Sequence, residues 1–201
     1  MIELIKTGGT TMIFLLIVSV VSLGFIIEKF ISLRFERKRL NNYKRIIEKH
    51  NFSISDLSKV LKKDESTSAT ILKNVLENSS MAKDENTDIT RSLLRHEISV
   101  LEKGLEIIEI SASISPLLGL LGTVIGMIEA FSAISSQGIG DPSVFSHSIS
   151  KALITTVVGL IVAIPSYAAY LFFSKKVEDI VAETDKYATI LTTSLYGKKN
   201  V

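Results

Sequence analysis

The sequence predicts an all-α membrane protein with three transmembrane helices and long cytoplasmic helical extensions. Its 201 residues contain three stretches without Asp, Glu, Lys or Arg, namely Thr7–Ile27, Ile110–Ile128 and Ala152–Ser174. Each stretch is close to the ~20 apolar residues that a helix needs to cross a bilayer. The charged residues are gathered in blocks between these stretches, unlike those of a soluble domain. The chain has no cysteine, which excludes disulfides and thiol chemistry.

The three apolar stretches divide the chain into seven segments. The first stretch could be a secretory signal, but it is longer than an ordinary signal core and no small-residue cleavage site follows it. We therefore expect it to be a retained span. The expected segments are an N-terminus over 1–8, spans over 9–31, 110–134 and 148–174, a cytoplasmic helical segment over 32–109, an outer hairpin over 135–147 and a C-terminal cytoplasmic helix over 175–201.

The distribution of positive charge predicts the orientation, because Lys and Arg are enriched on the cytoplasmic side. The hairpin sequence SSQGIGDPSVFSHSIS contains neither residue, and Lys175 and Lys176 follow the third span. We therefore expect a periplasmic N-terminus and hairpin and a cytoplasmic C-terminus, and we interpret the basic run after the first span as a topology signal rather than a nucleic-acid site. That run contains Arg34, Arg37, Lys38, Arg39, Lys44, Arg45 and Lys49.

The cytoplasmic segment is predicted to contain several helices. The pattern indicates a helix over about 36–49, short helices around Val60–Leu61 and over about 71–76, and a polar loop over 78–88. A regular apolar seam then leads toward the second span without an apparent breaker, so we expect one long helix that contains Pro116. The seam consists of Leu94, Ile98, Leu101, Leu105 and Ile108.

Small and hydroxyl-bearing residues gather on one side of each of the last two spans. On a helical wheel of about 100° per residue, the small residues around Thr123 fall within one arc of about 120°. They include Gly119, Gly122 and Gly126 in the second span, and Ala152, Thr155, Thr156, Gly159, Ala163 and Ser166 form the corresponding face of the third. Such faces allow close helix packing, and the alternative is that they line a shared lumen or hold another helix.

Two charged residues flank these faces near the outer interface. Glu129 follows Thr123 by six residues and Lys151 precedes Thr156 by five, which places both roughly 8–9 Å outward of the threonines. Because a lone charge in a membrane is costly, one hypothesis is an ion pair between them. The alternative is that each side chain is solvated at the interface.

Several kinds of chemistry have no candidate residues. Neither small face carries a carboxylate or histidine at mid-bilayer, and the phosphate-binding loop of ATP-driven proteins is missing. His50, His96 and His147 are isolated, so we expect no metal site. We expect neither enzymatic activity nor a cofactor.

Two motifs carry a resemblance to a known family. SPLLGLLGTVIGMIEAF together with ISKALITTVVGLIVAIPSYAAYLFF resembles the paired signature of the ExbB/TolQ/MotA proton-channel family, with the closest likeness to its ExbB group. The resemblance extends to the three-span topology, whereas the four-span MotA pattern does not fit.

The resemblance implies a motor in the bacterial inner membrane. It implies a homopentamer whose second and third spans surround a pore, single-span ExbD-like partners in that pore with a proton-carrying aspartate, and a TonB-like protein that receives the energy. A TolQ-type subunit that energises envelope constriction, and a non-conducting membrane scaffold, are the alternatives.

The resemblance also implies roles for particular residues. Thr123 and Thr156 match the pore threonines of the family, Thr155 could share their role, and the small-residue face would line the pore. Lys151 stands where several members have a glutamate, which puts a direct role of that position in proton passage in doubt. Membrane lipid headgroups are expected at Arg34, Arg37, Lys38 and Arg39.

Overall fold

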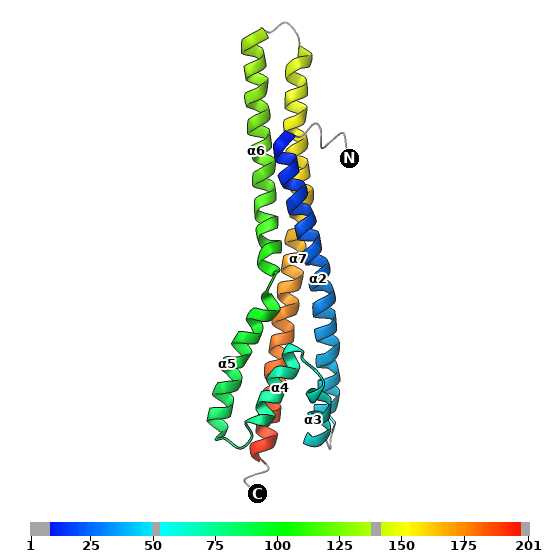
Figure 1. The fold of residues 1–201 in the computed structure, drawn as a ribbon, viewed down its shortest axis with the longest axis vertical. Helices are drawn as coiled ribbons and strands as arrows, with labels where there is room; N and C mark the ends of the chain where they lie inside the picture. The colour runs from blue at the N-terminus through cyan, green and yellow to red at the C-terminus, as the bar shows by residue number, and fades with distance from the viewer. Residues whose placement is uncertain (1–8, 50–52, 138–141, 198–201) are drawn as a thin grey trace. The chain divides into compact units, whose positions relative to one another are not determined.

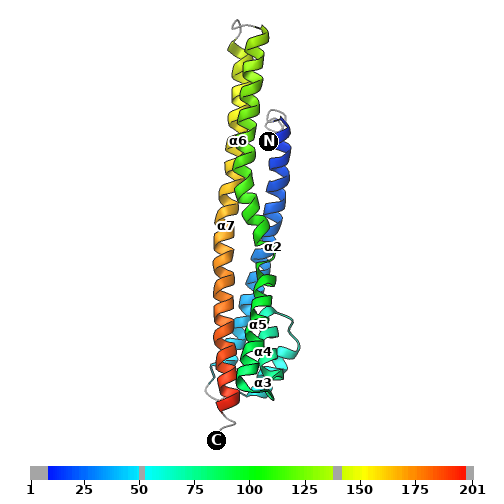
Figure 2. The same cartoon turned by 90° about the vertical axis from the view of Figure 1, so that its left-hand side faces the viewer.

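The computed structural model describes residues 9–49, 53–137 and 142–197, which form α-helices and no β-strand (Figures 1 and 2). By length and composition, three of the helices could cross a membrane. This confirms the all-α prediction and its three candidate spans. The helices are α2 (Gly9–Ile47), α3 (Ile54–Lys62), α4 (Thr67–Glu77), α5 (Lys83–Glu102), α6 (Leu105–Gln137) and α7 (Pro142–Gly197).

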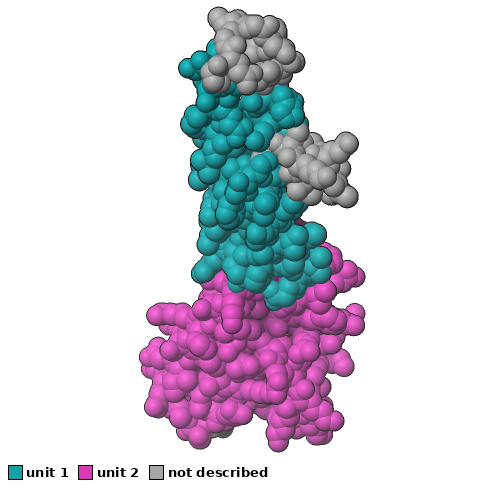
Figure 3. All heavy atoms as spheres, turned by 45° about the horizontal axis from the view of Figure 1, so that its top comes forward, with its two compact units in different colours: residues 1–28, 104–171 teal, residues 29–103, 172–201 magenta. Residues whose placement is uncertain are grey.

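The chain divides into two compact units (Figure 3). Unit 1 consists of Met1–Glu28 and Gly104–Leu171, and unit 2 consists of Lys29–Lys103 and Phe172–Val201. Helices α2 and α7 each contribute residues to both units. Unit 1 therefore contains α6 and the first parts of α2 and α7, and the short helices α3, α4 and α5 belong to unit 2.

Unit 1 is an antiparallel pair of α6 and α7, against which the first part of α2 packs (Figures 1 and 2). The hydroxyls of Ser22 on α2 and Ser166 on α7 lie 2.8 Å apart, and both side chains are buried. Ser166 donates its proton to the Val162 carbonyl at 2.8 Å, so Ser22 is the donor between the two helices. Such interhelical hydrogen bonds hold helices together in lipid, where no hydrophobic effect does so.

The outer faces of unit 1 are apolar and exposed. Phe14 and Val20 on α2 are 54% and 71% exposed, and Phe131 on α6 and Ile164 on α7 are 65% and 66% exposed. Large contiguous apolar surfaces of this kind mark contact with a membrane or another protein.

Unit 2 has an apolar core formed by side chains from α2, α3, α4, α5 and α7. These helices turn their apolar seams toward one another, with helical spacing that places every third or fourth residue inside. The fully buried large side chains of this core are Leu40, Tyr43, Leu57, Leu61, Ile71, Leu72, Val75, Ile180, Tyr187 and Leu191.

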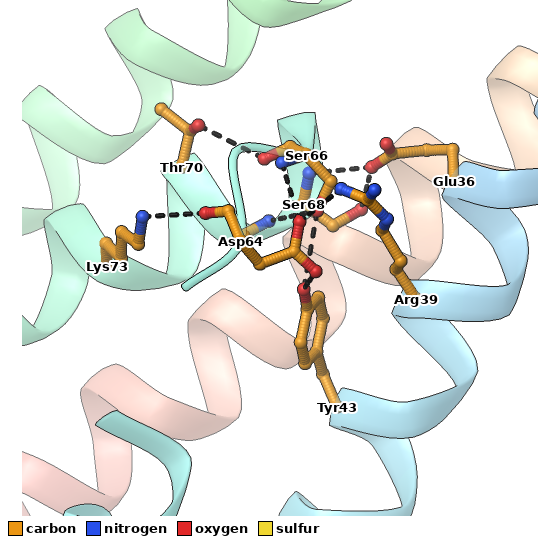
Figure 4. Close-up of polar contacts among 9 residues, drawn as sticks. Glu36, Arg39, Tyr43, Asp64, Ser66, Ser68, Thr70 and Lys73 are labelled. Carbon is orange, nitrogen blue, oxygen red and sulfur yellow. Dashed lines mark hydrogen bonds and ion pairs between the residues drawn. The ribbon is translucent and has the colours of Figure 1, made fainter. Parts of the chain in front are cut away.

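A polar cluster fixes the start of α4 to α2 (Figure 4). The Asp64 carboxylate accepts hydrogen bonds from the Tyr43 hydroxyl, the Arg39 guanidinium and, at 2.9 Å, the Ser66 backbone N–H. Ser66 is the N-cap of α4 and accepts from the Ala69 N–H at 3.3 Å. These contacts satisfy donors that the first helical turn leaves without an intrahelical partner.

The Asp64 carboxylate is held in its charged form. Burial by itself would raise its pKa, but hydrogen bonds from Tyr43 and Ser66 and the charge of Arg39 outweigh burial, so the pKa of Asp64 lies below its ordinary value. Hydrogen bonds to a carboxylate stabilise the charged form.

A second carboxylate joins three helices in unit 2. Glu36 on α2 is buried and accepts hydrogen bonds from the Ser68 N–H at 2.8 Å and the Ser68 hydroxyl at 2.7 Å. The Ser68 and Thr184 hydroxyls lie 3.1 Å apart, which links α4 to α7. Glu36 lies at the N-terminus of α4, where the helix dipole also favours a negative charge.

The predicted continuous helix through the cytoplasmic seam and the second span is wrong. α5 ends at Glu102 and α6 begins at Leu105, with Gly104 between them at φ 90°. A glycine adopts this left-handed conformation without the steric cost of a side chain and commonly follows a helix C-terminus. The buried Lys29 ammonium donates to the Leu101 carbonyl at 3.0 Å, so it provides a hydrogen-bond donor for one of the last carbonyl groups of α5.

The predicted loop over 78–88 is too long. α5 already begins at Lys83, and Asp84 and Glu85 occupy its first turn, where acidic side chains interact favourably with the helix dipole. Asn86 is buried and donates to the Val75 carbonyl at 3.0 Å. The polar composition that indicated a loop is thus the composition of a helix start.

Replacement of Asp64 by Asn should lower the free energy of unfolding by about 1–3 kcal/mol at neutral pH, because it removes the charge from several buried or half-buried hydrogen bonds. The measurement is chemical unfolding of the detergent-purified protein, followed by helicity. Asp56→Asn is the matched control, because Asp56 is exposed and lies 3.7 Å from Lys59. That exposed pair should contribute less than about 0.5 kcal/mol.

The effect of Asp64→Asn should depend on pH. Because the folded-state pKa of Asp64 is lowered, its contribution is fully present above the unfolded-state pKa of about 3.9 and is lost as the pH falls through the folded-state pKa. The difference between wild type and variant should therefore shrink under acid conditions. An equal difference at neutral and acid pH would contradict this account of the cluster.

Candidate functional site

The small-residue faces of α6 and α7 pack against each other within one chain. The glycines and alanines of the predicted face are buried. Residues early in one stretch meet residues late in the other, as an antiparallel arrangement requires. The buried residues are Gly119, Gly122 and Gly126 on α6 and Ala152, Gly159 and Ala163 on α7. Close helix packing, the first of the two interpretations of these faces, is therefore present in the structure.

Glycine is required at several of these contacts. A Cβ atom on Gly159 would lie 2.6 Å from the Ser115 carbonyl oxygen, and one on Gly122 would lie 2.6 Å from Thr155 Cβ. At Gly126 the distance to Ala152 Cβ would be 2.7 Å. Since a backbone carbonyl cannot rotate away as a flexible side chain can, the contact at Gly159 sets how closely the helices approach.

The three predicted threonines have different surroundings. Thr155 is 1% exposed and donates mainly to its own helix, at 2.7 Å from the Ala152 carbonyl. Thr156 is half-buried and its hydroxyl reaches across to the Gly119 carbonyl at 3.1 Å. Thr123 is half-buried and donates to the Leu120 carbonyl at 2.6 Å.

Two of these hydroxyls thus lie at the border of the packed face rather than inside it. Thr123 and Thr156 are partly accessible, whereas Thr155 is enclosed by the helix pair. The glycines themselves are covered by the neighbouring helix of the same chain. Their role as pore lining stays a prediction, and any surface that they share with a partner would have to include the borders around Thr123 and Thr156.

Sequence reasoning placed Ser166 on the small-residue face but missed Ser22 and the hydrogen bonds that the serines make. Ser22 lies in the first span and joins α2 to Ser166 on α7. Ser115 is fully buried, and its hydroxyl donates to the Ser111 carbonyl at 2.6 Å one residue before Pro116. The available signal was that a serine in an apolar span needs a hydrogen-bond partner. The identity of that partner depends on how the helices pack.

Glu129 and Lys151 form an ion pair between the outer halves of α6 and α7. The Lys151 ammonium lies 2.8 Å and 3.1 Å from the two carboxylate oxygens. The two side chains are 45% and 23% exposed, respectively. A Cβ atom on Gly9 would lie 3.2 Å from Lys151 Cε, so the lysine stem also lies against the start of α2.

The four residues predicted to meet lipid headgroups are not equivalent. Arg39 is engaged with Asp64, and Arg37 lies 3.6 Å from Glu183. The Arg34 guanidinium lies over the Phe30 ring at 6.0 Å, and Lys38 is exposed. Arg34, Lys38 and Arg39 are all exposed, but of these three only Arg39 forms an ion pair with a carboxylate of the described residues.

Within the described ranges, no group of His, Cys, Asp and Glu side chains is arranged to hold a metal ion. His50 lies outside those ranges, and His96 and His147 are exposed. In unit 1, the polar groups described between α6 and α7 are hydroxyls, backbone carbonyls and the Glu129–Lys151 ion pair. Such groups can solvate or hydrogen-bond a charge but do not carry a proton at mid-bilayer by titration.

Gly159→Ala should destabilise the α6–α7 pair by about 1–3 kcal/mol, because the added methyl group forces the backbones apart. Gly24→Ala is the matched control, since a Cβ on Gly24 meets nothing within 4 Å. The control should be neutral or stabilising by up to about 1 kcal/mol through helix propensity. Unfolding by SDS in mixed micelles measures both, and equal stability of the two variants would refute the requirement for glycine at 159.

Reversal of either charge of the outer ion pair should destabilise unit 1 by about 1 kcal/mol, because it places like charges side by side at a partly exposed site. The double variant Glu129→Lys/Lys151→Glu should recover most of the loss. The same SDS unfolding assay provides the measurement. If the double variant is as unstable as the sum of the single variants, the pair does not contribute.

Comparison with known proteins identifies a family. Residues 63–186 match the MotA/TolQ/ExbB proton channel family. A putative biopolymer transport protein ExbB-like 1 of Helicobacter pylori is 38% identical over 90 residues, which cover 45% of this chain and 48% of that protein. The Tol-Pal system protein TolQ of Haemophilus influenzae is 36% identical over 109 residues, 52% of this chain and 48% of that protein.

A third relative is the biopolymer transport protein ExbB of Aquifex aeolicus, 43% identical over 79 residues, 39% of this chain and 53% of that protein. The chain spans about half the length of the curated relatives it matches. The matched region includes the hairpin of α6 and α7 with its threonines, and three helices are apolar and long enough to cross a membrane. The chain is therefore a multi-pass membrane protein and belongs to the MotA/TolQ/ExbB proton channel family.

Proposed function

We propose that the chain is the channel subunit of a proton-driven motor in the bacterial inner membrane. In this proposal, five copies surround the single spans of an ExbD-like partner, and the complex supplies a TonB-like protein with energy for transport across the outer membrane. The observation that carries the proposal is the pair of half-buried hydroxyls, Thr123 and Thr156, beside the packed glycine face of α6 and α7 in a proton channel family.

The chemistry of the helix pair supports a division of labour between two proteins. The stretches Ile110–Ile128 and Ala152–Ser174 contain no Asp, Glu, Lys, Arg or His. A proton carrier at mid-bilayer must therefore come from a partner, for which a membrane carboxylate is the simplest choice. The hydroxyls of Thr123 and Thr156 can both donate and accept hydrogen bonds, so they suit a group that alternates between charged and neutral forms.

The packed glycine face gives the pair the stiffness that such a role requires. Helices that approach to backbone contact keep their relative register, and the threonines then stay at fixed positions along the pair. A partner helix would move along the border of the pair, where Thr123 and Thr156 are accessible, and the glycines would hold that border in place. In this arrangement the N-terminus and the outer hairpin are periplasmic and the C-terminus is cytoplasmic.

A second candidate is a TolQ-type role in envelope constriction, which the TolQ relative of Haemophilus influenzae favours at 36% identity. Expression of the chain with its partner in host strains that lack either the ExbB or the TolQ system separates the two roles. Recovery of TonB-dependent uptake supports the first role, and recovery of envelope integrity alone supports the second. A non-conducting scaffold would restore neither.

Thr123→Val and Thr156→Val should each reduce TonB-dependent uptake by about tenfold or more, because valine keeps the shape and removes a hydrogen bond to a charged group. The measurement is uptake of an iron complex by cells that co-express the partner, with co-purification as the test of assembly. Thr192→Val is the matched control, since its hydroxyl only donates to the Ala188 carbonyl in the C-terminal part of α7. Thr155→Val tests the enclosed hydroxyl and should have little effect on uptake.

Normal uptake by both the Thr123 and Thr156 variants would assign these residues to packing and remove them from the proton path. Loss of uptake together with loss of assembly would have the same consequence, because the defect would then be structural. Loss of uptake in assembled complexes is the result that the proposal requires.

A further inference from the structure

A groove of about 1120 Å³ lies between α2 and α7 in unit 2. One wall is formed by α2 residues at and after the end of the first predicted span, and the other by α7 residues at and after the end of the third. Apolar side chains at its membrane-side end are about half exposed, which is unusual for a region next to a well-packed core. They are Phe30, Ile31 and Phe35 on α2 and Phe172 on α7.

The other lining residues of the groove give it a strong positive charge. Among the described residues that line it, none is acidic. Positive charge attracts an anion within about a Debye length, and this attraction is strongest where a low-dielectric wall reduces screening. The cationic side chains that line the groove are Arg34, Arg37, Lys38, Lys44, Arg45 and Lys176, of which Arg37 is paired with Glu183.

The two walls carry the same local arrangement of a cation over an aromatic ring. Arg34 lies over the Phe30 ring at 6.0 Å on α2, and Lys176 lies over the Phe172 ring at 5.5 Å on α7. In each case the aromatic residue precedes the cation by one helical turn. Along both walls, an apolar surface that belongs to the end of a span therefore passes into a cationic surface within a single turn.

An apolar surface followed by a cationic surface matches an amphiphile with an anionic headgroup. The apolar part would accept acyl chains, and the cations would contact a phosphate at the depth where a cytoplasmic leaflet has its headgroups. A water-soluble phosphate compound would leave the exposed Phe and Ile side chains uncovered. An uncharged apolar segment would leave the cations uncompensated.

We propose that this groove is a binding site for one anionic phospholipid of the cytoplasmic leaflet. Its acyl chains lie against Phe30, Ile31 and Phe172, and its phosphate lies among Arg34, Lys38 and Lys176. Arg39, which the sequence alone would include, does not take part, because its guanidinium is bound to Asp64. The proposal depends on the membrane location of the chain and not on proton conduction.

The test uses the full chain reconstituted in phosphatidylcholine bilayers that contain a trace of spin-labelled lipid. The preference of the protein for spin-labelled phosphatidylglycerol over spin-labelled phosphatidylcholine is measured from the motionally restricted fraction. Arg34→Gln/Lys38→Gln removes two charges of the groove, and Lys62→Gln/Lys63→Gln is the matched control. Both control lysines are exposed and do not line the groove.

A second variant tests the apolar part of the groove, where the acyl chains would lie, without any change of charge. Ile31→Trp fills the groove, and Ile27→Trp is its control on the same helix, because Ile27 is 52% exposed and does not line the groove. Unchanged helicity of each variant shows that the fold is retained. The proposal predicts that the preference for phosphatidylglycerol falls to unity in Arg34→Gln/Lys38→Gln and in Ile31→Trp and is retained in both controls.

Three results would overturn the proposal. If Lys62→Gln/Lys63→Gln lowers the preference as much as the groove variant, the attraction is a diffuse effect of net charge. If Ile31→Trp retains the preference, the cations attract the headgroup alone and the groove does not bind the acyl chains. If all variants retain it, the groove holds another occupant, such as an acidic segment of a partner protein.

Discussion

The close approach of α6 and α7 at Gly159 is the contact on which the rest of unit 1 depends. The absence of a side chain there lets the α7 backbone lie against the Ser115 carbonyl and the Gly119 backbone. With that register fixed, the Thr156 hydroxyl reaches the Gly119 carbonyl, and Glu129 meets Lys151 further along the same pair. The close approach that the glycine permits thus determines where the polar groups of this hairpin lie.

Unit 2 is held together by a different kind of interaction. It has an apolar core, and buried or half-buried carboxylates bind the N-terminus of α4 to α2. A carboxylate without its hydrogen bonds would be costly in such surroundings, so Asp64 and Glu36 stabilise one arrangement of the short helices. The membrane-spanning unit relies on small residues and hydroxyls, because charged groups of this kind would be too costly in lipid.

The division between the two units bears on function. A hairpin that contains hydroxyls but no mid-bilayer carboxylate can position and solvate a proton carrier, and it cannot itself be that carrier. The family match agrees with the channel-subunit role proposed above. The glycines are covered, but they fix the positions of the half-buried Thr123 and Thr156 along the helix pair.

The sequence by itself determined the features that depend on periodicity and composition. Uncharged stretches of about span length are sufficient for the all-α class and the candidate spans, and helical spacing is sufficient to group the small residues around Thr123 and Thr156 on one face of each helix. That these faces pack against each other within one chain was decided by the tertiary structure. The break at Gly104 could be read only from the tertiary structure, because a glycine in a helical seam is compatible with both a continuous and an interrupted helix. Tertiary structure also decided the bond between Ser22 and Ser166 and the choice of Asp64 as the partner of Arg39. These contacts join residues far apart in the chain, and local spacing carries no information about which distant side chain will be near.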